Sequence, residues 1–115
     1  MALANDPSWS EILDKSQHSF LNLPLEEKSR LGYFWFAVMR TTETLYHHYL
    51  KGNADASIWE AQAGGLENNL RSPGFREWWH NRGYPFTTEF TDFVNTSLDR
   101  VESSGEPYDW FGNAK

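Results

Sequence analysis

Glu43, His47 and His48 form the one cluster of residue types in the sequence that commonly bind metal ions. Glu43 and His47 are four residues apart, so on a helix they share a face and could reach one ion, whereas His48 points roughly 100° away. A catalytic zinc site needs a third protein ligand, and the candidates, His18 and His80, lie on other elements. The cluster is therefore an alternative hypothesis for a metal-dependent enzyme.

The same pair has an ordinary structural interpretation, which we favour. Glu and His at this spacing are common on solvated helix surfaces, and Arg40 shortly before Glu43 supports a surface position. The sequence has no Cys, no Gly-x-Ser-x-Gly elbow and no phosphate-binding loop, which removes several catalytic chemistries. We expect a protein without enzyme activity, metal or cofactor.

Charge and hydropathy exclude two further classes of function. The net charge of −6 argues against binding to nucleic acid, because phosphate recognition needs a basic face. The longest apolar stretch runs from Tyr33 to Met39, too short to span a membrane. The N-terminus lacks the basic and apolar regions of a signal peptide.

Helix-start signals followed by apolar residues at helical spacing recur along the whole chain. They predict helices over about 7–21, 24–51, from Ser57 to about Leu70, 73–81, and from Thr87 or Thr88 to about Val101. The fold class is therefore all-α, a single compact bundle of about five helices with a long central second helix. We expect residues 1–5 to be a disordered or artificial start, 6–101 the helical domain and 102–115 a flexible tail. Gly64-Gly65 predicts a bend or a close approach in the third helix.

Aromatic residues make up 17% of the chain and mark its core. Consecutive rings, as at 34–36 and 78–79, cannot all face one side of a helix, so each must meet a different element or lie exposed. We predict that Trp59, Trp78 and Phe93 share one core. Candidate anchors for a partner are Trp35, Trp79 and Trp110.

The block Ser72-Pro73-Gly74-x-x-x-Trp78-Trp79, with Asp6-Pro7, Trp59-Glu60 and Phe90-x-x-Phe93-Val94, resembles a family of small bacterial proteins of unknown function. Members commonly carry an N-terminal membrane segment. The resemblance implies a helical fold and no catalytic residues. This chain departs from the pattern in having no membrane segment, so it is either a soluble member or begins just after an anchor.

From these observations we expect a non-catalytic module that contacts an unknown protein partner or a second copy of itself, close to a membrane if an anchor precedes it. A metal enzyme using Glu43 and His47 is one alternative. A small-ligand binder with an aromatic pocket is the other, because such pockets need only a few polar groups.

Overall fold

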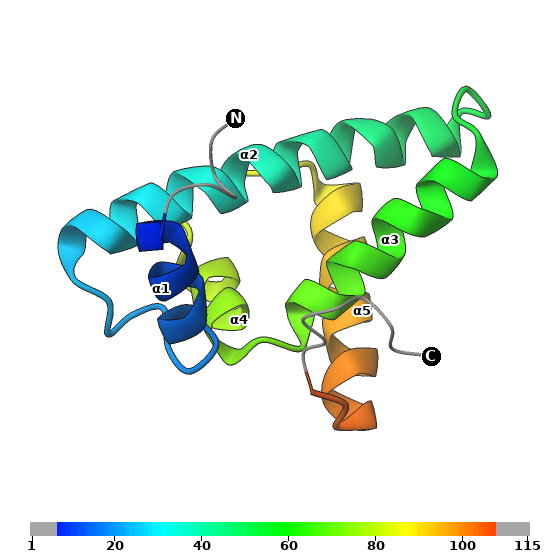
Figure 1. The fold of residues 1–115 in the computed structure, drawn as a ribbon. Coiled ribbons are helices and arrows are strands. Elements are labelled where there is room, and N and C mark those ends of the chain that lie inside the picture. The colour runs from blue at the N-terminus through cyan, green and yellow to red at the C-terminus, as the bar shows by residue number, and fades with distance from the viewer. Residues whose placement is uncertain (1–6, 108–115) are drawn as a thin grey trace.

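The structure, a computed structural model, describes residues 7–107. Its helices are α1 (Pro7–Ser16), α2 (Leu25–Leu50), α3 (Ala56–Leu70), α4 (Pro73–Asn81) and α5 (Thr88–Ser104), and residues 7–107 contain no strand. In Figure 1, α2 runs along one side of the molecule, α3 turns back beneath it, and α1 lies against α4 while α5 lies against α3. The predicted all-α fold with a long second helix is confirmed. None of these helices is both long and apolar enough to cross a bilayer.

Helix starts and ends show which local signals decided the boundaries. Asp55, and not Ser57, caps α3, because its carboxylate accepts hydrogen bonds from the N–H groups of Ser57 at 2.8 Å and Ile58 at 3.4 Å. Helix α1 ends at Ser16, five residues before the predicted end. Helix α5 continues through residues 102–104 of the predicted tail and stops at Gly105, whose φ of 68° is the left-handed conformation that glycine favours.

Helix α2 is central because each of the other four helices packs on it. Of its three consecutive rings, Phe34 contacts Trp9 of α1 with ring centroids 5.6 Å apart, and Trp35 packs on two rings of α4. Phe36 lies against Tyr84 in the α4–α5 connection. Rings of the last turns of α2 meet aromatic residues of α3 and α5. The prediction that consecutive rings meet different elements is confirmed, and none of the three is exposed.

The predicted core is correct in its centre and divided at one end. Trp78 belongs to the main core, and Trp59 is also buried. Trp59, however, packs with Tyr46, Tyr49 and the half-buried Phe93 at the end of the α2–α3 hairpin. The main core consists of Ile12, Phe20, Leu23, Leu31, Trp35, Met39, Leu66, Leu70, Phe75, Trp78, Trp79, Phe90, Val94, Leu98 and Val101.

The first residues of the Ser72–Trp79 block begin α4 and bring it against α1. The Ser72 hydroxyl caps the helix by accepting a hydrogen bond from the Phe75 N–H at 3.4 Å, and Pro73 occupies the first turn, where its missing N–H costs nothing. A Cβ atom at Gly74 would lie 1.7 Å from the carbonyl oxygen of Ser16. Only glycine can therefore occupy this position while α1 and α4 stay in place.

Glu77, one turn further along α4, holds the connection between α1 and α2. Its Oε1 atom accepts hydrogen bonds from the Ser19 hydroxyl at 2.9 Å, the Phe20 N–H at 2.8 Å and the Leu21 N–H at 3.1 Å. These donors, with the Leu21 N–H contributing most, hold the pKa of the Glu77 carboxyl below its ordinary value. The carboxylate thereby satisfies backbone groups that follow the end of α1.

Replacing Gly74 tests the contact between α1 and α4. Because the added methyl group of Gly74→Ala would overlap a backbone oxygen, we expect a loss of about 3 kcal/mol or more in the free energy of unfolding. Gly64→Ala is the matched control. That position is open and helical, so we expect a gain of up to about 1 kcal/mol. Chemical denaturation measures both, and equal stabilities for Gly74→Ala and the parent chain would contradict the contact.

Candidate functional site

Glu43 is a buried residue that caps a neighbouring helix. Only 4% of its surface is exposed. Its Oε1 accepts a hydrogen bond from Arg40 Nη1 at 2.5 Å, and its Oε2 accepts one from the Thr87 N–H at 2.6 Å. Thr87 is the N-cap of α5, and its hydroxyl accepts the Phe90 N–H at 3.2 Å. This is the arrangement of a capping box, with the carboxylate supplied by another helix.

The structure does bring Glu43 and His47 together, at Thr87. His47 Nε2 lies 2.8 Å from the Thr87 hydroxyl, while His48, His18 and His80 are exposed. The expected solvated surface pair is wrong for Glu43, because its side chain is buried, with Oε2 bound to the N-cap of α5 and Oε1 bound to Arg40 of α2. Within residues 7–107, no three His, Asp or Glu side chains are grouped so that they could hold a metal ion.

The tryptophans proposed as anchors for a partner lie inside the molecule where the structure describes them. Trp35 and Trp79 are 6% and 1% exposed. The Trp79 indole N–H donates to Asn95 Oδ1 at 2.9 Å, and its ring lies beneath the Arg82 guanidinium at 3.6 Å from the centroid. These rings pack within the chain, and neither presents a surface to a partner. Trp110 lies outside the described residues.

Two adjoining hollows open beside α2 and form the candidate site. One, of about 270 Å³, lies between α1, α2 and the region where α3 passes into α4. The other, of about 120 Å³, lies between α2 and α3. Both are lined by Val38 and Asn69, and together we call them the α2–α3 cleft. Its lining consists of Leu13, Gln17, Phe34, Trp35, Val38, Met39, Thr42, Ala61, Gln62, Gly65, Leu66, Asn69, Ser72 and Phe75.

No side chain of the α2–α3 cleft carries a charge, although 23% of the sequence is Asp, Glu, Lys or Arg. Two of its polar groups are already engaged, since Gln62 Nε2 donates to the Thr42 hydroxyl at 2.8 Å. That hydroxyl donates in turn to the Val38 carbonyl at 2.9 Å. The side-chain amide of Asn69, which lines both hollows, makes no hydrogen bond with any other residue in 7–107. It offers a free donor and a free acceptor beside apolar walls.

Gly64 and Gly65 lie within α3 but do not bring another backbone close. A Cβ atom at either position would meet nothing within 4 Å, so the predicted close approach is wrong. Gly65 lines the smaller hollow, where the absence of a side chain leaves space between α2 and α3. An interior helical glycine costs about 1 kcal/mol relative to alanine. The residue that leaves this part of the cleft open, Gly65, is therefore one that destabilises α3.

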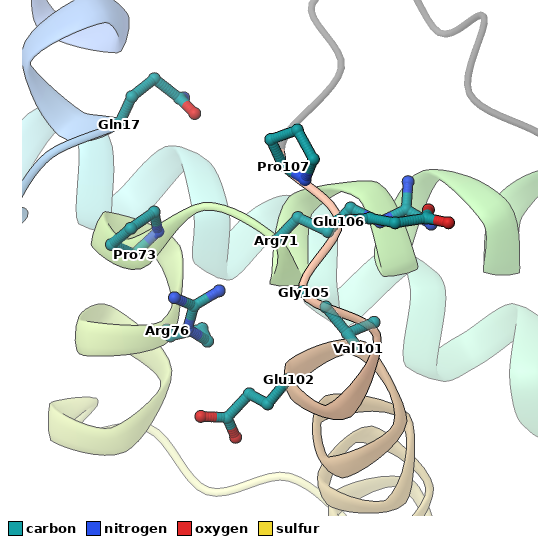
Figure 2. A pocket seen from close by; sticks show the side chains of 9 residues that line it. All are labelled: Gln17, Arg71, Pro73, Arg76, Val101, Glu102, Gly105, Glu106 and Pro107. Carbon is teal, nitrogen blue, oxygen red and sulfur yellow. The ribbon is translucent and has the colours of Figure 1, made fainter.

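A separate hollow, of about 510 Å³, lies on the other side of the first turn of α4 and is shown in Figure 2. We call it the α4–α5 groove. Unlike the cleft, it is lined by Arg71, Arg76, Glu102 and Glu106. Gln17 lines both the α4–α5 groove and the larger hollow of the α2–α3 cleft, so the charged and the uncharged site are neighbours.

Comparison with known proteins brings no relative to this chain: no family model matches it, and neither a curated protein nor a solved structure is significantly similar. The resemblance drawn from the Ser72–Trp79 block therefore stays a prediction. Function has to be argued from the geometry of the chain itself.

Sequence reasoning missed the residues that the cleft brings together. Asn69 and Gln62 carry no motif, and their proximity to α2 depends on the angle at which α3 returns along it. Gly64-Gly65 was the one available signal. The pair predicts a bend or a close approach, whereas Gly65 lines open space between α2 and α3.

Substitution of Glu43 separates a capping role from a metal-binding role. We expect Glu43→Ala to lower the free energy of unfolding by about 1–3 kcal/mol, because the Thr87 N–H and Arg40 Nη1 both lose the carboxylate that accepts from them. Glu60→Ala, an exposed site on α3, is the control and should change little. A chelator should leave the melting temperature of the parent chain unchanged. A melting temperature that falls with chelator in the parent chain but not in Glu43→Ala would reveal a metal instead.

Proposed function

We propose that this chain is a non-catalytic binding protein for a small, uncharged and mostly apolar molecule held in the α2–α3 cleft. The observation behind this proposal is the free Asn69 amide, which lies where an uncharged, mostly apolar hollow meets a smaller uncharged one. Sites for small molecules are typically apolar and aromatic, with a few polar groups that fix the orientation of the ligand. The cleft has this composition.

The lining decides the class of ligand. A charged ligand would lose its hydration shell and find no opposite charge in the cleft, which is costly. The rings of Phe34, Trp35 and Phe75 favour a flat apolar body. The Asn69 amide favours a group that both donates and accepts hydrogen bonds, such as another amide.

The volume of the α2–α3 cleft limits the size of the ligand. Sites for drug-sized ligands measure about 300–1,000 Å³, and the two hollows together reach the lower end of that range. A ligand with one aromatic ring and one amide group fits this scale. Benzamide is such a molecule and serves as the probe.

Two other functions have less support from the geometry. Catalysis would need a set of converging reactive groups, and Glu43, the most buried carboxylate of the described residues, is committed to capping α5. Contact with a protein partner was expected through Trp35 and Trp79, which are in the core. The cleft is therefore the better basis for a function.

Filling the smaller hollow at Gly65 should weaken binding without harming the fold. Gly65→Leu places a side chain at the smaller hollow. Leucine also favours the helix over glycine by about 0.8 kcal/mol. We therefore expect a higher melting temperature together with weaker benzamide binding, measured by isothermal titration calorimetry, because the leucine narrows the space on one side of Asn69. Few binding-site substitutions combine these two effects.

Gly64→Leu is the matched control, because Gly64 is equally helical and exposed but does not line the cleft. It should raise the melting temperature and keep benzamide binding. Unimpaired binding by Gly65→Leu, or no binding by the parent chain at millimolar benzamide, would refute the proposed site.

A further inference from the structure

The α4–α5 groove is lined by two arginines, Arg71 and Arg76, and by two glutamates, Glu102 and Glu106. In Figure 2, Arg76 extends from α4 into the groove, Glu102 projects from α5, and Glu106 overlaps Arg71. Among these four side chains, residues 7–107 contain one ion pair, between Arg71 and Glu106. The other charged groups keep hydrogen-bonding capacity that a ligand could use.

Arg71 has the least complete set of partners. Its side chain is only 14% exposed, and Nη2 lies 3.0 Å from Glu106 Oε2. Its Nε atom is buried and has no hydrogen-bond partner within residues 7–107. A guanidinium binds a carboxylate best through two parallel hydrogen bonds, and Glu106 supplies only part of that arrangement.

Arg76 is likewise only partly engaged. Its Nη1 donates to the Leu70 carbonyl at 2.8 Å, and no carboxylate within residues 7–107 forms an ion pair with it. The remaining donors of Arg76 are available to an acceptor in the groove. Both arginines flank Pro73, at the positive end of α4, which also favours a negative group.

Glu106 is weakly held on Arg71. It follows Gly105, the left-handed residue that ends α5, and its side chain is 47% exposed. Ion pairs exposed to this degree contribute little to stability, because water screens them. A carboxylate that reached both Arg71 and Arg76 could replace it.

We propose that the α4–α5 groove binds a small monocarboxylate with a short apolar body, and that Glu106 occupies the Arg71 part of this site in its absence. The carboxylate contacts Arg71 and Arg76. The apolar body lies along the apolar lining of the groove, Pro73, Val101 and Pro107. Glu102 disfavours a second negative charge, which restricts the ligand to one. This site goes beyond the function proposed for the uncharged α2–α3 cleft and does not depend on it.

Butyrate and its uncharged counterpart butyramide are the probes. Titration followed by NMR of the arginine Nε–H groups reads out Arg71 and Arg76 directly. Butyrate should shift both resonances, and butyramide should shift neither. Arg71→Lys keeps the positive charge but loses the paired N–H donors of the guanidinium, so it should bind butyrate more weakly.

Glu106→Gln gives the decisive result, because removal of an internal competitor raises the apparent affinity. We expect butyrate to bind about threefold to tenfold more tightly than to the parent chain. Glu60→Gln makes the same change in net charge at an exposed position of α3 and should leave the affinity unchanged. The proposal is overturned if butyrate fails to shift Arg71 and Arg76 in Glu106→Gln. Equal gains in Glu106→Gln and Glu60→Gln would also overturn it, since they would indicate a general charge effect.

Discussion

The approach of the Gly74 backbone to the Ser16 carbonyl is the constraint on which the rest of the structure depends. The contact lies at Ser16, the last residue of α1, and seats the end of that helix against the first turn of α4. Three side chains of α4 and its N-cap have separate roles. Ser72 caps the helix, Glu77 accepts hydrogen bonds from the α1–α2 connection, and Trp78 packs over Gly32 of α2. With α1 and α4 fixed in this way, Gln17 and the start of α4 form a wall between the α2–α3 cleft and the α4–α5 groove.

Two carboxylates that could be taken for chemical groups serve instead to satisfy backbone N–H groups across the fold. Glu77 accepts from the α1–α2 connection, and Glu43 accepts from the N-cap of α5. Burying a carboxylate is costly unless it is hydrogen-bonded, and each of these has donors from an element distant in sequence. Polar contacts of this kind fix the relative positions of helices whose apolar packing alone is tolerant of small shifts. Both hollows depend on those positions.

The helices could be predicted from the sequence because their signals are local. Apolar spacing and the Ser72-Pro73 start placed α4 at its observed bounds, and Gly52 ended α2 as expected. The position of the end of α1 could not be predicted, because it lies against Gly74, 58 positions further along the chain, and only tertiary packing brings the two together. Burial of Glu43 was missed for the same reason, since its partner Thr87 is brought to it by tertiary packing. The cleft combines both difficulties, because its lining comes from four helices and one free amide.

The α2–α3 cleft is thus an uncharged site with a single free amide, kept open at Gly65 and bounded by the α1–α4 contact. Crystals of the parent chain soaked with benzamide would show the site itself. We expect density for the ring against Phe34, Trp35 or Phe75, with the ligand amide hydrogen-bonded to Asn69. Well-ordered crystals in which the cleft stays empty at saturating benzamide, or in which benzamide binds only elsewhere, would contradict it.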